Sequence, residues 1–159
     1  ERALQMADLV DKGLRPMVAA EGEAPLAAIL EIADSDMTYR GRYMALPSAV
    51  PVLDLLLLDE SNPRGLLHQV VRIEREMLDL PREGIYRTPA QRAVLALSTH
   101  LRLADADALD PSRDDATAFA RLLGEVRGHL HAASDHLHRA YFELAEQATT
   151  TFAHRGPGR

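Results

Sequence analysis

Residues 35–64 read SDMTYRGRYMALPSAVPVLDLLLLDESNPR, and the apolar run inside this stretch decides the fold. The segment Pro51–Leu58 is apolar at every position except Asp54. A helix that is apolar on all sides has to be surrounded by other elements, so we predict that this segment forms the central and most buried helix. The side chains expected to have almost no exposed area are Leu53, Leu56 and Leu57.

Helix-start signals lie on both sides of this run. Ser35 is a favoured N-cap residue, and the helix that it opens should continue to about Leu46. Asn62-Pro63 is typical of a helix start, because asparagine caps well and proline is tolerated at the first helical position. The apolar residues that follow recur at spacings of four and three, which predicts an amphipathic helix as far as Leu80.

The flanking parts of the chain show the same helical periodicity. Residues 1–14 and 25–34 each carry one apolar stripe, which predicts two further amphipathic helices. The tetrapeptide Thr88–Gln91 has the pattern of a capping box, in which the two side chains satisfy each other's backbone N–H groups. It should open a helix that continues to about Ala108.

One long helix is predicted to close the fold. Between residues 111 and 150 apolar residues alternate at spacings of four and three, whereas no part of the chain shows the two-residue alternation of a strand. The predicted fold is therefore all-α, an antiparallel bundle of about six helices with a long C-terminal helix. We expect one domain over residues 1–153 and a disordered tail over residues 154–159.

Composition excludes several classes of protein. The chain has 159 residues, a formal net charge of −6 and no cysteine. The negative charge argues against nucleic-acid binding, which needs a basic surface, and no apolar run approaches the length of about 20 residues needed to cross a membrane. The absence of cysteine excludes disulfides and thiolate chemistry and fits the reducing cytoplasm. We expect a cytoplasmic protein without a cofactor.

A cluster of tyrosine and arginine precedes the apolar run. Its members, together with an arginine that follows the run, are Tyr39, Arg40, Arg42, Tyr43 and Arg64. Guanidinium groups and phenol hydroxyls can bind a phosphate or a carboxylate, so these residues are a candidate anion site. The alternative is purely structural, with the rings packed in the bundle and the arginines paired to nearby aspartates such as Asp54 and Asp59.

Two other groups of polar residues could carry chemistry. Glu1 and Arg2 open the chain and could take part in acid–base work, although an exposed helix face looks the same. Four histidines lie in the last helix, and the closest set of potential ligands there is His131, Asp135 and His138. A metal ion would need further ligands from another helix, so we predict no metal site. The usual motifs of serine nucleophiles, phosphate loops and zinc proteases are absent.

The sequence resembles the alpha-E family, bacterial all-helical domains associated with circularly permuted ATP-grasp proteins. The resemblance rests on three motifs, which are Glu1-Arg2-Ala3-Leu4-Gln5, the stretch Met37–Tyr43 and the stretch Val52–Leu66 with its Asp54, Asp59 and Asn62. There are two departures, since Gly41 stands where a third arginine is usual and Gly65 where serine is usual. The first lowers the charge of any anion site by one.

The resemblance implies partners and a context. The family's domain is about twice as long as this chain, so we expect residues 1–153 to be its C-terminal half. The face that would contact the other half should then be covered by a second copy of the chain, which predicts a homo-oligomer. An ATP-grasp ligase, and possibly a transglutaminase-like peptidase, are the implied partners. Two functions follow: a non-catalytic interaction domain of a peptide or amide-bond synthesis system, or an enzyme or ligand-binding domain that uses the Tyr/Arg cluster with Glu1 and Arg2.

Overall fold

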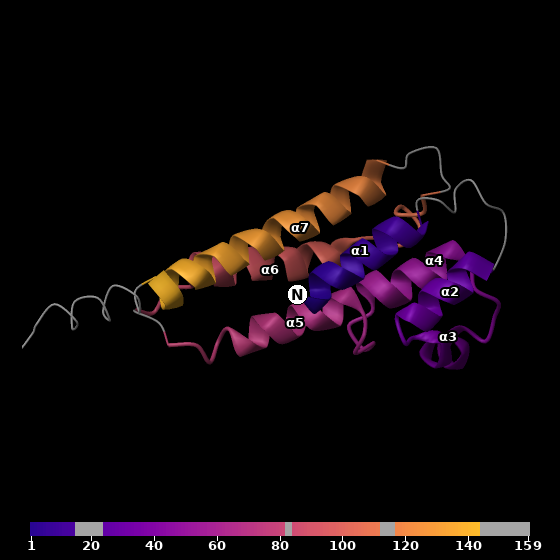
Figure 1. Cartoon of the computed structure of the whole chain (residues 1–159), viewed down its shortest axis with the longest axis horizontal. Helices are drawn as coiled ribbons and strands as arrows, with labels where there is room; N and C mark the ends of the chain where they lie inside the picture. The colour runs from indigo at the N-terminus through magenta and orange to yellow at the C-terminus, as the bar shows by residue number, and fades with distance from the viewer. Residues whose placement is uncertain (15–23, 82–83, 112–116, 144–159) are drawn as a thin grey trace, which may run out of the picture.

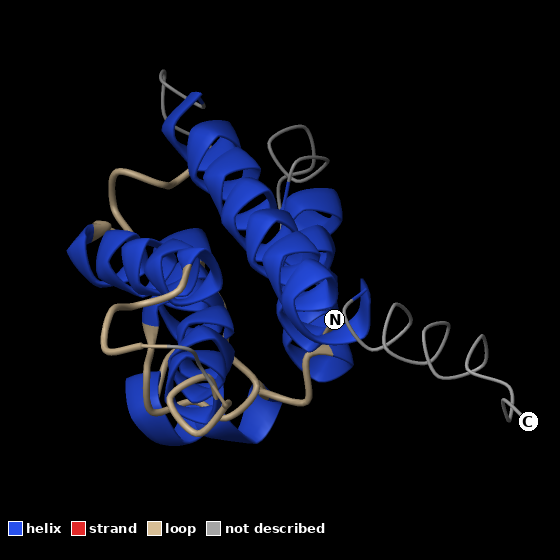
Figure 2. Cartoon of the chain, turned by 90° about the vertical axis from the view of Figure 1, so that its left-hand side faces the viewer, coloured by secondary structure: helices blue, strands red, loops and turns tan. Residues whose placement is uncertain are grey.

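All regular secondary structure in the described part of the chain is helical. The computed structural model describes residues 1–14, 24–81, 84–111 and 117–143. Within these ranges there is no strand (Figure 2), which confirms the all-α prediction. The α-helices are α1 (Arg2–Leu14), α2 (Ala24–Ile32), α3 (Asp36–Tyr43), α4 (Ala49–Leu53), α5 (Leu66–Glu76), α6 (Pro89–Leu103) and α7 (Thr117–His138). Short π-helical segments follow α4 and α7, at Asp54–Leu58 and Arg139–Glu143.

The predicted antiparallel bundle is present, but four helices form it instead of about six. Helices α1, α5, α6 and α7 run along the long axis of the molecule, while α2, α3 and α4 gather at one end (Figure 1). Helix α6 packs against both α5 and α7, and α1 packs against the same two helices from the other side. No helix among the described residues is long and apolar enough to cross a membrane.

The leucine run lies in the middle of this arrangement. Leu53, Leu56 and Leu57 have no exposed area, which confirms the predicted burial. The π-helical segment Asp54–Leu58 contacts α1, α5 and α6, and the preceding α4 contacts α2. This central position explains why nearly every side of the segment has to be apolar.

The leucine run is not the uninterrupted helix from Pro51 that the sequence predicts. Helix α4 begins at Ala49, and from Asp54 the backbone widens into a π-helical turn, in which the N–H of Asp59 donates to the Asp54 carbonyl at 2.8 Å. In an α-helix that N–H would instead bond the Leu55 carbonyl. The Leu55 carbonyl therefore needs another donor, and the side chain of Asn62 supplies it at 3.0 Å.

The prediction that Asn62-Pro63 starts a helix is wrong. Helix α5 begins at Leu66, and its N-cap residue is Gly65. The side-chain oxygen of Asn62 accepts from the Arg64 N–H at 3.1 Å, and the backbone carbonyl of Asn62 accepts from the Gly65 N–H at 2.9 Å. Asparagine thus closes a turn on its own backbone, an arrangement that competes with helix capping.

Ser35 occupies the predicted N-cap position of α3 but makes no capping hydrogen bond. Its hydroxyl donates to the Ala33 carbonyl and accepts a bond from the Asn62 side chain instead, because the residue is completely buried. Helix α3 also ends at Tyr43, three residues earlier than predicted. Met44 follows it in the left-handed conformation, with φ of 48°, which stops the helix.

The other predicted helix ends differ from the observed ones by a few residues. Helix α5 ends at Glu76 and α6 at Leu103, each about one turn early. The predicted capping box is present, since the Thr88 hydroxyl accepts from the Gln91 N–H and the Gln91 side chain accepts from the Thr88 N–H. The predicted last helix is observed over Thr117–His138, whereas residues 112–116, 144–150 and the tail at 154–159 lie outside the described part of the chain.

Truncation of the leucine run should lower stability strongly. We expect Leu56→Ala to reduce the free energy of unfolding by about 2–5 kcal/mol, because it removes buried apolar area and leaves a cavity in the core. The matched control is Leu46→Ala, since that side chain is 68% exposed and its loss should change stability by only about 0.5 kcal/mol. Urea unfolding followed by circular dichroism measures both, and equal effects would contradict the central position of Leu56.

Candidate functional site

Tyr39 is a buried structural residue rather than a free ligand-binding group. Its side chain has no exposed area, and its ring lies 4.8 Å from that of Tyr43, one helical turn along α3. The hydroxyl donates to the Leu46 carbonyl at 3.1 Å and accepts from the Ser48 N–H at 3.3 Å. Tyr39 therefore stabilises the conformation of the loop that joins α3 to α4.

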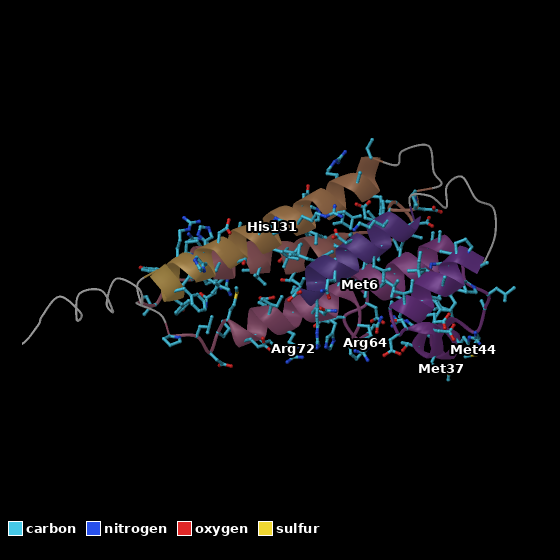
Figure 3. All side chains as sticks on the ribbon, in the orientation of Figure 1. Met6, Met37, Met44, Arg64, Arg72 and His131 are labelled. Atoms are coloured by element: carbon cyan, nitrogen blue, oxygen red, sulfur yellow. The ribbon has the colours of Figure 1, made fainter. Side chains whose placement is uncertain are left out.

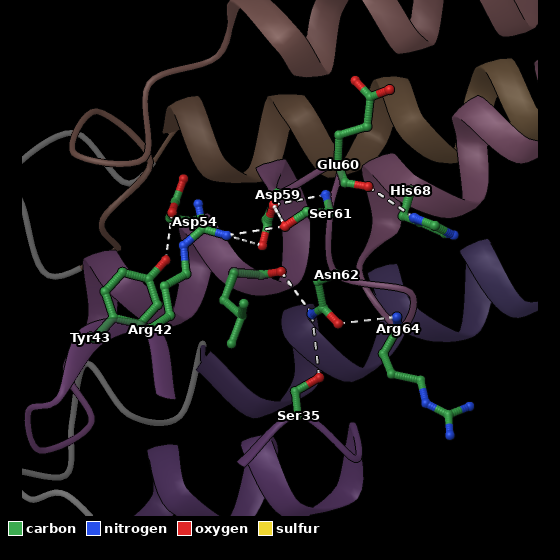
Figure 4. Close-up of polar contacts among 11 residues, drawn as sticks. Ser35, Arg42, Tyr43, Asp54, Asp59, Glu60, Ser61, Asn62, Arg64 and His68 are labelled. Carbon is green, nitrogen blue, oxygen red and sulfur yellow. Dashed lines mark hydrogen bonds and ion pairs between the residues drawn. The ribbon is translucent and has the colours of Figure 1, made fainter. Parts of the chain in front are cut away.

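Tyr43 and Arg42 connect α3 to the π-helical segment and the residue that follows it (Figure 4). The Tyr43 hydroxyl donates to the Asp54 carboxylate at 2.5 Å, and the Arg42 guanidinium pairs with the buried Asp59. Asp59 also accepts from the N–H and the hydroxyl of Ser61. These contacts place Asp54 and Asp59 opposite the tyrosine and arginine of α3, as the structural alternative requires.

The Tyr43 hydroxyl is held in its protonated form. Burial raises the pKa of this phenol well above its ordinary value of 10.0, and the hydrogen bond to the negatively charged Asp54 raises the pKa further. The nearby Arg42 guanidinium, 5.8 Å from the centre of the Tyr43 ring, acts in the opposite direction but is a weaker influence on the pKa. Tyr43 is therefore a hydrogen-bond donor near neutral pH.

The three arginines of the candidate anion site do not meet in one place. Arg40 pairs with Asp36 on its own helix at 3.1 Å, whereas Arg64 pairs with Asp34 at the end of α2. Figure 4 shows the Arg64 side chain directed away from Arg42, and Arg40 and Arg64 line different hollows of the surface. The structure separates what the sequence suggested as a single site.

Asn62 stands at the centre of the polar contacts in this region (Figure 4). It is 1% exposed, and its side chain bonds the Leu55 carbonyl, the Ser35 hydroxyl and the Arg64 N–H. The adjacent Gly65 lies so close to the π-helical segment that a side-chain carbon there would stand 3.1 Å from the Leu55 carbonyl oxygen. Asn62 and Gly65 are thus packed closely against the leucine run.

A different combination of the predicted residues does come together. Glu1, Arg2 and Arg64 line a groove of about 660 Å³ between the start of α1 and one face of α5, which we call the α1–α5 groove. A second hollow of about 370 Å³ adjoins it and shares Arg2 and Arg64. Figure 3 shows Arg64 and Arg72 on the same side of the molecule. Helix α5 contributes His68, Arg72 and Glu76.

The α5 residues of this groove were missed in the sequence, although a signal was present. His68, Arg72 and Glu76 are spaced by four residues, so they lie on one face of the helix. The Arg72 guanidinium pairs with Glu76 at 2.8 Å. The His68 ring nitrogen Nδ1 lies 2.8 Å from the carbonyl oxygen of Glu60. What the sequence could not show is that this face lies beside the start of α1.

The histidines of α7 include candidate metal ligands that the sequence suggested. Within the described ranges, no three histidine, aspartate or glutamate side chains are arranged so that they could hold a metal ion. His131, Asp135 and His138 are all exposed on the surface of α7. On the neighbouring α6, His100 lies 2.8 Å from the Glu125 carboxylate of α7, a contact that joins these two helices.

Comparison with known proteins gives a family but no solved relative. The model of the Alpha-E family, described as a predicted alpha-helical domain with a conserved Glu-Arg motif, matches residues 1–142. Uncharacterized proteins of Mycobacterium tuberculosis and Mycobacterium bovis are each 30% identical over 139 residues. That alignment covers 85% of this chain but only 16% of those relatives. No solved structure matches the chain.

The Glu-Arg dipeptide occurs twice, and the two copies have different surroundings. Glu1-Arg2 lines the α1–α5 groove, whereas Glu74-Arg75 lies on another face of α5. There Glu74 accepts from the buried Ser98 of α6 at 2.8 Å, and Arg75 lies 3.9 Å from Glu60. The first copy borders a hollow, and the second copy joins neighbouring elements.

Loss of the Asn62 side chain should destabilise the fold. We expect Asn62→Ala to lower the free energy of unfolding by about 1–3 kcal/mol, because the Leu55 carbonyl and the Arg64 N–H would lose their partners. Ser134→Ala, at an exposed position of α7, serves as the control and should have almost no effect. Chemical denaturation measures both variants. An Asn62→Ala protein as stable as the control would show that the side chain is dispensable.

The contribution of Tyr43 should disappear at alkaline pH. Since its folded-state pKa is raised above 10.0, its stabilising effect is complete below about pH 10 and is lost as the pH rises towards the folded-state pKa. The difference in unfolding free energy between the wild type and Tyr43→Phe should therefore shrink from about pH 8 to about pH 11. Tyr86→Phe, at a side chain that is 81% exposed, should show no such change in urea unfolding.

Proposed function

The chain belongs to the Alpha-E family, and we propose that it is a non-catalytic helical interaction domain that serves an ATP-grasp ligase. In this proposal the bacterial system of which it is part makes or modifies a peptide or another amide bond, with a transglutaminase-like peptidase as a further partner. The alignment with the mycobacterial relatives supports the idea of one part among several, since it covers only 16% of their length. The choice of a ligase and a peptidase as partners is based on the family resemblance.

The observation that carries this proposal is an exposed apolar surface at the end of α3. A hollow of about 780 Å³, the α2–α3 hollow, is lined by alanines of α2, by the paired Asp36 and Arg40 of α3 and by the loop from Met44 to Pro47. Met44 is 87% exposed and Leu46 is 68% exposed, and Figure 3 places Met44 and Met37 together at this end of the molecule. Exposed apolar patches of this kind are typical of protein interaction sites.

The loop that presents these side chains is held in one conformation. The buried Tyr39 hydroxyl bonds the backbone of both Leu46 and Ser48, and Met44 has a left-handed backbone that bulky residues rarely adopt. A loop that is already ordered loses little entropy when a partner binds. Methionine also adapts its shape to a partner surface. These features support a docking role for the α2–α3 hollow, with the ligase as its occupant.

Binding to the ligase should depend on the α2–α3 hollow. We expect the purified chain to bind the ATP-grasp protein of the same genome, and Met44→Asp and Leu46→Asp each to weaken that binding by about tenfold or more, because a charge would be placed against an apolar contact. Leu103→Asp, at a side chain of α6 that is 80% exposed, is the matched control. Biolayer interferometry measures the affinities.

Three results would contradict the proposal. The chain and the ligase could fail to bind each other, or the Met44→Asp and Leu46→Asp variants could bind the ligase as tightly as the Leu103→Asp control. Alternatively, analytical ultracentrifugation could show that the hollow is occupied by a second copy of the chain, which Met44→Asp would then separate. That last result would support the proposed homo-oligomer instead of a ligase-binding surface.

A second candidate function is a ligand-binding or catalytic domain. The observation that favours it is the α1–α5 groove, where Glu1 and Arg2 lie beside Arg64. The Tyr/Arg cluster contributes no group to this groove except Arg64, since Tyr39, Arg42 and Tyr43 are engaged with the α3–α4 loop, Asp59 and Asp54. The candidate ligand site therefore consists of the Glu-Arg motif and the face of α5.

A further inference from the structure

Arg2 differs from the other arginines of the α1–α5 groove in its surroundings. Arg64 is paired with Asp34, and Arg72 is paired with Glu76. Arg2 is exposed and lines both the groove and the adjoining hollow, yet no carboxylate of the described residues pairs with it. The Glu1 carboxylate also lines the groove, but it accepts from the Gln5 side chain at 3.3 Å and makes no ion pair with Arg2 among the described residues. Arg2 is therefore the guanidinium of the groove that a carboxylate of a bound molecule can engage.

His68 presents a hydrogen-bond acceptor in the same groove. Its Nδ1 lies 2.8 Å from the Glu60 carbonyl oxygen, and a carbonyl oxygen can only accept, so this nitrogen carries the proton. In the neutral ring the other nitrogen, Nε2, is then an acceptor. The Glu60 carboxylate accepts from Nε and Nη2 of Arg102, both at 3.1 Å. The half-buried His68 ring is therefore oriented by a hydrogen bond to the backbone of a residue whose side chain is bound to α6.

The groove thus offers a cation for one carboxylate and an acceptor for one N–H donor. Its volume of about 660 Å³ is within the range of small-molecule sites. A molecule with a single carboxylate and an adjacent amide N–H has both complementary groups, and that combination is the carboxyl end of a peptide. A phosphate dianion brings two charges to a single unpaired guanidinium, so it matches the groove less well.

We propose that the α1–α5 groove binds the carboxyl end of a peptide, with the carboxylate on Arg2 and the terminal amide N–H on Nε2 of His68. This inference rests on the second candidate function and names its ligand class. It is independent of the α2–α3 hollow, because neither Arg2 nor His68 lines that surface.

The test uses four small probes and the chain with an acetylated N-terminus, which removes the charge of the terminal amine. N-acetylglycine has the carboxylate and the amide N–H, whereas N-acetylsarcosine keeps the carboxylate and lacks the N–H. N-acetylglycine methyl ester lacks the charge, and inorganic phosphate is the other anion. Titrations followed by ¹H–¹⁵N nuclear magnetic resonance give the dissociation constants and identify the perturbed backbone amides.

We expect N-acetylglycine to bind most tightly and to shift amides of the first turn of α1 and of residues 64–76. Arg2→Gln should weaken its binding about tenfold, the usual effect of losing a charge-assisted hydrogen bond. Arg121→Gln is the matched control, because Arg121 is an exposed arginine of α7 that lines none of the described hollows. It should leave the dissociation constant unchanged.

The role of His68 is tested by combining a change in the protein with a change in the probe. His68→Phe should weaken N-acetylglycine to the level of N-acetylsarcosine and should leave N-acetylsarcosine itself unaffected. Equal loss for both probes would reject the hydrogen bond to Nε2. Circular dichroism and thermal unfolding of each variant establish that the fold is retained.

Different failures have different meanings. If phosphate bound in a way that depended on Arg2, and N-acetylglycine bound no better, the proposal of a peptide carboxyl end would be rejected. The second candidate function, a ligand-binding domain, would still stand. If no probe perturbed the groove at millimolar concentration, both would be rejected. Neither result would affect the proposed docking of the ligase, which is measured on the α2–α3 hollow.

Discussion

The structure depends on one constraint, that a backbone buried among leucines still has to satisfy its hydrogen bonds. The π-helical turn at Asp54–Leu58 meets this constraint for the Asp59 N–H but leaves the Leu55 carbonyl to the buried Asn62. Asn62 in turn bonds Ser35 before α3 and the Arg64 backbone before α5. A single amide side chain thus connects three parts of the chain that meet around the leucine run.

The Tyr/Arg cluster supports the same region from the outside. Tyr43 and Arg42 of α3 engage Asp54 and Asp59, which lie at the start and just beyond the end of the π-helical turn. Contacts of this kind fix the position of a wide helical turn, whose backbone geometry is less favourable than that of an α-helix. In this structure the arginines of the cluster pair with aspartates and Tyr43 donates to Asp54, which are the contacts that the structural alternative predicts.

Two surfaces of the described residues carry our proposals for interaction with other molecules. The loop after α3 presents apolar side chains around Met44, and the start of α1 presents Arg2 beside the polar face of α5. The two surfaces have different chemistry, one suited to an apolar protein contact and the other to a small polar molecule. A helical domain with both could hold a partner protein and a ligand at once.

The all-α class, the burial of the leucine run and the capping box at Thr88 could be predicted from the sequence, because apolar periodicity and capping are local properties of the chain. The π-helical turn in the leucine run and the hydrogen bond from Asn62 to the Leu55 carbonyl, in place of a helix start, could be seen only in the folded chain. The same holds for Arg64, which lines a groove with Arg2 rather than with Arg40. Such features depend on which residues that are far apart in the chain come into contact. The local spacing of residues does not predict those contacts.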